Sequence, residues 1–197
     1  MIKFLEGQVE FIDRKETLRY LGYKASDVCE GEALSLIEEC EREVLAVQKL
    51  RAVYGIYGIV RGQSLDLGFA KVNSRALAIN LEGCDKIILF AATAGAGIDR
   101  LIVKYSRISP AKAAVIQAMG AALVEQWCDE ICRIFRDEYG ANKSRFSCGF
   151  GDLPLSLQRD VFAALCVTKN LGITLSDDYF MTPTKSVTAI VGIKEKK

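Results

Sequence analysis

The sequence predicts an α+β domain with a mainly antiparallel sheet, a long central helix and flanking helices. Two runs rich in β-branched and aromatic residues, 52–61 and 64–71, meet at a turn that contains Gly62, which is typical of an antiparallel hairpin. A continuous apolar run at 86–93 indicates a buried strand. Apolar residues then recur at helical spacing over 110–139, which indicates a helix of about 40 Å.

The sequence of the N-terminal part predicts one strand and two helices before the hairpin and one short helix after it. The alternating segment 8–13 indicates a strand, and a short helical segment at 14–20 follows it and ends at Gly22. Residues 32–50 place apolar side chains at helical spacing among many glutamates, so we expect an amphipathic surface helix with a solvated charged face. Another short helix is expected at 74–81, after the hairpin.

The strand at 86–93 leads through a glycine-containing segment, 94–97, into a helix expected at 98–105. The glycine spacing lacks the third glycine of the dinucleotide fingerprint and the Gly-Lys-Ser/Thr of a phosphate loop. A tight turn between strand and helix is therefore the better interpretation, although its glycines could let the backbone approach a ligand or partner.

The long helix is expected to begin with Ser109 as N-cap and Pro110 at its first position. Its apolar stripe consists of Ile116, Met119, Leu123, Trp127, Ile131 and Ile134. A further helix is predicted at 155–167, with the chain leaving the helical pattern near Gly172. Two closing strands, 173–176 and 186–193, flank a loop at 181–185.

Composition indicates one soluble globular domain over residues 1–197, with 194–197 as a tail. The chain has 197 residues, half of them apolar and a quarter charged, and its net charge is +1. This balance does not favour nucleic acid or an anionic membrane surface as a partner. No apolar run reaches the length of a membrane span, and the N-terminus lacks a signal-peptide pattern, so a cytoplasmic location is expected.

Cysteine and histidine usage excludes several kinds of site. The chain has seven cysteines, with no Cys-x-x-Cys pair, which argues against a disulfide framework and against zinc. Cys128 and Cys132 share a helix face, where thiols are usually small core residues. No cysteine spacing suits a radical iron–sulfur cluster. Because histidine is absent, a Ser-His-Asp or Cys-His nucleophile and a histidine ligand to a metal or corrinoid are excluded.

The segment Arg145-Phe-Ser-Cys-Gly149-Phe150-Gly151-Asp152-Leu-Pro154 is the candidate for a ligand-binding loop. Two glycines flank Phe150, so the backbone can take conformations that a side chain would forbid. Arg145 offers a planar fork of donors suited to a carboxylate or phosphate. Asp152 and Pro154 lead into the next helix. The alternative is a plain turn between strand and helix that carries an exposed arginine.

Arg145-x-x-x-Gly149-Phe150 resembles the Arg-x-x-x-Gly-Tyr loop with which the activation domain of cobalamin-dependent methionine synthase holds S-adenosylmethionine. The segments 151–158, 173–176 and 183–187 resemble free-standing relatives of that domain. The resemblance covers most of the chain and is strongest from Ala121 onward. It implies a fold like that of the activation domain.

The resemblance also implies the ligand-binding residues. They are Arg145, Ser147, Gly149, Phe150, Glu125 and Asp13. Arg145 would hold the methionyl carboxylate, while Glu125 and Asp13 would meet the amino group or the ribose. For Glu125 the alternative is a glutamate at the edge of the apolar stripe, and for Asp13 it is an N-cap, which is compatible with ligand binding. No catalytic side chain and no metal ligand is predicted.

This chain departs from the family at two places that matter for the ligand. Phe150 replaces the usual tyrosine, so stacking on an adenine is retained but a hydroxyl hydrogen bond is lost. The larger enzymes carry an aromatic pair, including a tyrosine that faces the ligand, where this chain has Ile190 and Val191.

The implied function is that of an activation subunit for a methionine synthase that lacks its own activation domain. Such a subunit binds S-adenosylmethionine and supports reductive methylation of cob(II)alamin, with cobalamin carried by the partner and an electron from a flavodoxin-like donor. One alternative is the reactivation of another corrinoid methyltransferase. The other is a docking scaffold that has lost ligand binding.

Overall fold

The computed structural model describes residues 1–24 and 30–194. Its core is a four-stranded antiparallel sheet in the order β1-β2-β6-β9. The strands are β1 (Ile2–Gly7), β2 (Leu50–Gly58), β6 (Lys86–Thr93) and β9 (Ser186–Ile193). With a long helix across this sheet, the fold class is α+β, as predicted. The expected tail lies outside the described residues, apart from Lys194.

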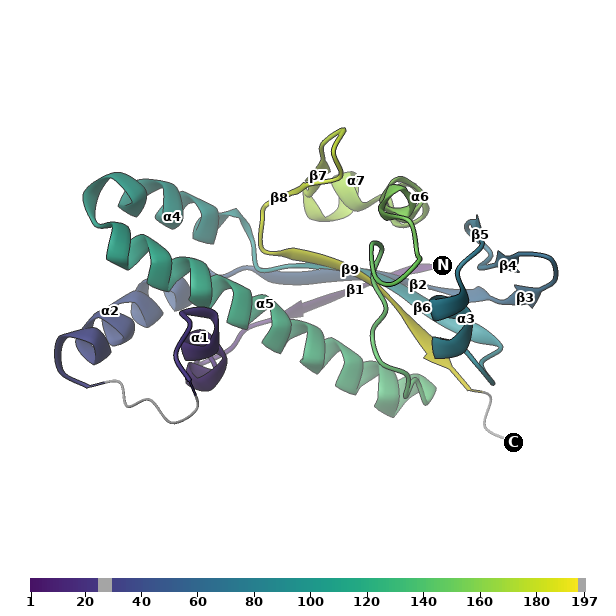
Figure 1. Cartoon of the computed structure of the whole chain (residues 1–197), viewed down its shortest axis with the longest axis horizontal. Coiled ribbons are helices and arrows are strands. Elements are labelled where there is room, and N and C mark those ends of the chain that lie inside the picture. Colours follow the sequence, from purple (N-terminus) through teal and green to yellow (C-terminus); the bar gives the residue numbers. More distant parts are fainter. Residues whose placement is uncertain (25–29, 195–197) are drawn as a thin grey trace.

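The two faces of the sheet bury separate cores. Helices lie on both sides of the sheet (Figure 1). One face packs against helix α5 (Pro110–Tyr139), with α1 (Arg14–Tyr20), α2 (Gly31–Val47) and α4 (Ala96–Ile108) around it. The other face is covered by shorter elements. These are α3 (Arg75–Asn80), the 3-10 turn η1 (Leu155–Leu157), α6 (Gln158–Leu165) and α7 (Val167–Leu171).

Helix α5 has the predicted bounds and most of the predicted stripe. Pro110 occupies its first turn, and Gly140 ends it in a left-handed conformation with φ of +69°. Ser109 stands at the N-cap position, but its side chain makes no capping hydrogen bond. At the C-terminal end, Phe135 is fully buried in the core and Ile134 is only half-buried, so the stripe ends on Phe135.

The strand predicted at 8–13 is wrong, because the strand that pairs with β2 is β1, which begins six residues earlier. Side chains hold the backbone of segment 8–13 instead of a neighbouring strand. The Gln48 amide donates to Val9 O (2.9 Å) and its Oε1 accepts from Val9 N (3.1 Å), while Glu41 Oε1 accepts from Ile12 N (2.8 Å). An alternating pattern therefore does not guarantee a strand where side chains satisfy the backbone.

The predicted hairpin exists, but it belongs to a separate small sheet. Residues 52–61 divide between β2 and β3 (Val60–Arg61), and Arg61 pairs with Leu65 across the turn. Residues 64–71 divide between β4 (Leu65–Asp66) and β5 (Lys71–Val72), which pair with each other. Helix α2 ends at Val47, earlier than predicted, because the chain must extend into β2 from Leu50.

The turn at 94–97 is a tight connection, as interpreted from the sequence. Gly95 has φ of +89°, and a Cβ on Gly97 would lie 2.5 Å from Val47 O at the end of α2. The close approach that these glycines permit is therefore to another part of this chain. Helix α4 follows and runs to Ile108, beyond the predicted end at residue 105.

The C-terminal helix and strands differ from prediction mainly in where the chain interrupts them. The predicted helix at 155–167 consists of η1, α6 and the start of α7, interrupted at Cys166 with φ of +49°, and Gly172 ends α7 as expected. Strand β7 (Thr174–Leu175) pairs with β8 (Met181–Thr182), which occupies part of the predicted loop. Strand β9 then crosses the sheet as predicted.

Candidate functional site

The loop at 145–152 is fixed to the edge of the central sheet at one end. Phe146 and Ile190 exchange two backbone hydrogen bonds, of 2.9 and 2.8 Å, next to β9. The loop then turns back at Gly149, whose φ is +88° and whose N–H donates to Leu153 O (2.9 Å). Only glycine adopts this conformation at low cost, so Gly149 shapes the loop, as the sequence suggested.

Arg145 points from this loop to helix α5, where two carboxylates receive it. Its Nη2 lies 3.0 Å from Glu125 Oε2 and 2.8 Å from Asp129 Oδ1. Only 23% of the arginine side chain is exposed, compared with 41% for Glu125 and 74% for Asp129. The guanidinium is therefore held on the surface of α5 by two partly exposed ion pairs.

Two hollows lie on either side of this ion-pair cluster, and Glu125 lines both. The first, of about 280 Å³, lies between α5, the loop and β9. It is lined by Glu125, Ser144, Arg145, Ser147, Phe150 and Val187. The second, of about 400 Å³, lies between α5, α1 and the segment before α1. It is lined by Phe11, Asp13, Glu16, Arg19, Tyr20, Ala122, Glu125, Gln126 and Asp129.

We call these two hollows together the α5 groove. Five of the six predicted site residues line it: Asp13, Glu125, Arg145, Ser147 and Phe150. Gly149 does not line it and acts through the shape of the loop. Each hollow alone is at or near the lower end of the size range of small-molecule sites, about 300–1,000 Å³.

Asp13 is placed beside α5 by Gln126. The Gln126 amide donates to Phe11 O (3.2 Å), and its Oε1 accepts from Asp13 N (3.2 Å). The Asp13 carboxylate caps α1, because Oδ1 accepts from Lys15 N (2.8 Å) and Glu16 N (3.1 Å). The N-cap interpretation is thus confirmed, and it is compatible with the position of Asp13 at the groove.

Phe150 presents an exposed ring at the rim of the first hollow. The residue is 56% exposed, and its ring lies 6.0 Å from that of Phe146 in an edge-to-face arrangement. Such contacts orient a ring while leaving one face open. Ile190 and Val191 are instead buried, and each packs in a different core of the sheet, so neither side chain reaches the groove.

Two functional candidates escaped the sequence analysis. Asp129 lies one helical turn after Glu125, and its spacing of four residues was the available signal. Asp152 was expected to lead into the helix that follows. It does precede η1, and its carboxylate also caps α3, accepting from Ser74 Oγ, from Arg75 N (2.8 Å) and from Ala76 N (3.1 Å). No local pattern indicated that contact between distant segments.

The thiols near Arg145 are poor nucleophiles. Burial raises the pKa of Cys128 to about 12, while the Arg145 guanidinium opposes that increase. Burial also raises the pKa of Cys132. Both groups therefore stay protonated at neutral pH. In the described part of the chain, no cluster of Cys, Asp and Glu side chains could hold a metal ion.

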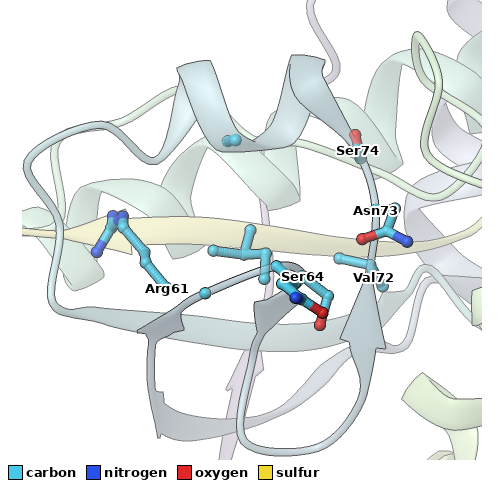
Figure 2. A pocket seen from close by; sticks show the side chains of 9 residues that line it. Arg61, Ser64, Val72, Asn73 and Ser74 are labelled. Carbon is cyan, nitrogen blue, oxygen red and sulfur yellow. The ribbon is translucent and has the colours of Figure 1, made fainter.

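A hollow of about 300 Å³ lies apart from the α5 groove, between α3 and the small sheet (Figure 2). Figure 2 shows Arg61 at one end and Asn73 and Ser74 at the other. Arg61 Nη2 is already engaged, since it donates to the carbonyls of Leu81 and Cys84 at 2.8 Å each. None of the predicted site residues lies here.

The fold and the groove together define the class of structure to which the chain is similar: an antiparallel sheet crossed by one long helix that carries a groove. No protein-family model and no curated protein sequence matches the chain. Its structure is similar to a crystal structure of the MetH reactivation domain bound to AdoHcy, with a TM-score of 0.78. The match covers 100% of this chain and 79% of that one at 17% sequence identity, which establishes a common fold.

None of the helices that the structure describes is both long enough and apolar enough to cross a membrane.

Proposed function

We propose that this chain binds S-adenosylmethionine in the α5 groove and acts as an activation subunit. It would support reductive methylation of cob(II)alamin on a cobalamin-dependent methionine synthase that lacks its own activation domain, in the cytoplasm. The observation that carries this proposal is that Asp13, Arg145 and Phe150 line two hollows that share Glu125, in a fold similar to that of the MetH reactivation domain.

Each side chain has a role that suits one part of the ligand. Arg145 receives the methionyl carboxylate, because guanidinium and carboxylate groups form strong charge-assisted hydrogen bonds. Glu125 and Asp13 accept from the ammonium group or the ribose hydroxyls. Among the described residues, both hydrogen bonds to the Asp13 carboxylate use Oδ1, so Oδ2 remains available.

The loop provides the surface for the adenine. Phe150 offers an exposed ring for stacking, and Ser147, which carries a hydroxyl group, lines the same hollow. Gly149 keeps the loop in the conformation that holds these two residues at the groove. A phenylalanine at position 150 keeps the stacking contribution of an aromatic ring and has no hydroxyl to bond the ligand.

The chemistry of the proposed reaction needs positioning more than acid–base catalysis. Cobalamin on the partner protein supplies a nucleophilic metal once it is reduced by a flavodoxin-like donor, and the sulfonium methyl group is intrinsically electrophilic. This chain orients the sulfonium so that its methyl group faces the partner. A chain without histidine can perform that role.

A titration with S-adenosylmethionine tests the proposal directly. Isothermal titration calorimetry on the wild-type chain should show binding at a single site, and a variant with Glu125→Gln should bind more weakly with little change in melting temperature. Absence of binding by the folded wild-type chain would favour the docking scaffold, which the burial of Val191 at the place of a family tyrosine also supports.

A different corrinoid methyltransferase as partner is the second candidate. The groove residues do not distinguish the two partners, because the ligand is the same. Pull-down with the tagged chain should recover a cobalamin-binding methionine synthase. Recovery of another corrinoid protein in its place would move the proposal to that alternative.

A further inference from the structure

The ion pair between Arg145 and Asp129 affects how a ligand can enter the α5 groove. Arg145 uses the same nitrogen, Nη2, for Glu125 Oε2 and for Asp129 Oδ1. Both hydrogens of Nη2 are thereby engaged, so a ligand carboxylate that binds Arg145 through Nη2 must displace one of these two carboxylates. Asp129 holds Arg145 less strongly than Glu125 does, because the Asp129 side chain is 74% exposed and water screens the ion pair.

The charge of this cluster determines which ligands are favoured. One guanidinium faces two carboxylates, so the cluster is net negative. The second hollow adds Asp13 and Glu16, of which Glu16 is paired with Arg19 at 2.7 Å. A ligand that brings only an anion to this place meets repulsion from the neighbouring carboxylates. A ligand that brings a cation next to its anion does not.

We propose that Asp129 is a specificity-determining residue: it pairs with Arg145 until a ligand binds and selects ligands that carry an ammonium group beside the carboxylate. This inference rests on the proposed function and names the part of the ligand that Asp129 recognises. In an α-amino acid both groups are attached to one carbon. When the carboxylate takes Arg145, the ammonium group must lie beside the carboxylates that flank the arginine.

When the ligand carboxylate replaces Asp129 at Arg145, each charged group keeps a neighbour of opposite charge. Asp129 releases Arg145 and accepts from the ligand ammonium group, while Glu125 remains next to both. An α-keto acid has no ammonium group, so it would displace Asp129 and leave that carboxylate without a cation. The groove therefore distinguishes an amino acid from the matching keto acid through Asp129.

The test compares two probes on three variants by calorimetry. The probes are S-adenosylhomocysteine and its α-keto acid analogue, in which a carbonyl replaces the ammonium group. The variants are Asp129→Asn, Asp129→Glu and the control Asp137→Asn. Asp137 lies on the same helix, is 60% exposed and pairs with Arg133 at 3.0 Å, outside the α5 groove, so its variant makes the same charge change elsewhere.

The measured quantity is the ratio of the two affinities for each protein. Asp129→Asn should reduce the preference for the amino acid probe about fivefold, as expected for the loss of one partly exposed ion pair. Asp129→Glu should restore most of it, and Asp137→Asn should leave it unchanged. Asp129→Asn removes two things: the carboxylate that competes for Arg145 and the partner of the ligand ammonium group. The first change affects both probes equally, so only the second changes the ratio of the two affinities.

Three outcomes overturn the inference in distinguishable ways. If the wild-type chain binds S-adenosylhomocysteine and Asp129→Asn keeps the wild-type ratio, Asp129 has no role in selection and the proposed function stands. If the folded wild-type chain binds neither probe, the proposed function fails together with this inference. A ratio that falls equally in Asp129→Asn and Asp137→Asn would indicate a general charge effect and would also overturn it.

Discussion

Arg145 is the residue on which ligand affinity should depend most. Replacing it with alanine removes a charge-assisted contact worth on the order of 1.5–3 kcal/mol, so affinity for S-adenosylmethionine should fall by about tenfold or more. The fold should persist, because the ion pairs that Arg145 makes are partly exposed. Calorimetry and circular dichroism on Arg145→Ala measure both quantities.

Two further variants give this prediction its controls. Arg145→Lys should rescue little, since lysine lacks the planar fork of donors. Arg159→Ala removes a guanidinium that is 62% exposed on α6 and should leave affinity unchanged. Wild-type affinity in a folded Arg145→Ala protein would remove this residue from the site.

The two buried lysines should respond to substitution with opposite changes in stability. Lys112 is paired with Glu39 at 2.7 Å and Glu43 at 2.6 Å. Lys185 is 6% exposed, and its ammonium group makes no ion pair or hydrogen bond within the part of the chain that the structure describes. Burial lowers the pKa of Lys185, and the Asp99 carboxylate opposes this only in part.

Lys185→Met should therefore raise the free energy of unfolding by about 1 kcal/mol, because a largely buried ammonium group without an ion pair is costly. Lys112→Met should lower it by about 1 kcal/mol. The folded-state pKa of Lys185 is below its ordinary value of about 10.4, so the unfolded chain binds more protons between the two values. The gain in free energy of unfolding that Lys185→Met gives over wild type should therefore shrink as pH rises from the folded-state pKa toward about 10.4. Equal stability of Lys185→Met and wild type in urea titrations at pH 7 would contradict the prediction.

At the scale of elements, Asp152 joins the ligand loop to helix α3. Its hydrogen bonds with Ser74 Oγ and with the backbone of Arg75 and Ala76 lower the pKa of Asp152. Their contribution to stability is fully present above the ordinary pKa of about 3.9 and is lost as pH falls through the lower folded-state pKa. Gly151 sits next to this contact with φ of +56°, and a Cβ there would lie 2.8 Å from Ala76 Cβ.

Asp152→Ala should lower the melting temperature and speed amide hydrogen exchange in α3, while exchange in α5 stays unchanged. The reason is that α3 has only six residues and depends on this carboxylate for its first turn. Asp178→Ala, which removes an exposed aspartate from the β7–β8 turn, serves as the control. Equal exchange rates in α3 for the two variants would show that the cap is dispensable.

The same contact shows how far the sequence predicts this fold. Strand β6 and helix α5 follow from patterns within one segment, an unbroken apolar run and a stripe between Pro110 and Gly140, and both have the predicted bounds. The bond between Asp152 and α3 joins positions more than seventy residues apart, and nothing near either position indicates it. The first strand was misplaced for a related reason, since Gln48 and Glu41 satisfy the backbone of segment 8–13.

The residues of the candidate site also divide into those that a local sequence pattern predicts and those that it does not. Arg145, Gly149 and Phe150 belong to one short motif, so their place in a common loop could be predicted. The groove needs α1, α5 and the loop to meet, and only the resemblance to a known family suggested that Asp13 and Glu125 would join Arg145. Asp129 was missed even though its spacing of four residues from Glu125 was a signal, because the arginine that it pairs with comes from another element.

At the scale of the whole molecule, the chain should not complete the proposed reaction alone. It has no histidine to bind cobalt, and its sequence has no cluster motif or nucleotide loop that would carry electrons. Under the proposed function it would hold one substrate of a reaction with three components, and the corrinoid would arrive on a partner. Such a division of labour makes methyl transfer dependent on the complex and not on this chain by itself.

With S-adenosylmethionine, free cob(II)alamin and a reductant, the chain should give little acceleration over the same mixture without it. Adding a cobalamin-loaded methionine synthase that lacks an activation domain should produce the absorbance spectrum of methylcobalamin. That spectrum should require both S-adenosylmethionine and an electron donor, and Arg145→Ala should slow its appearance when S-adenosylmethionine is limiting. If methylcobalamin forms equally fast without the chain, or if the chain alone methylates free cobalamin, the role of activation subunit is wrong, because positioning between two proteins is the contribution that this groove can make.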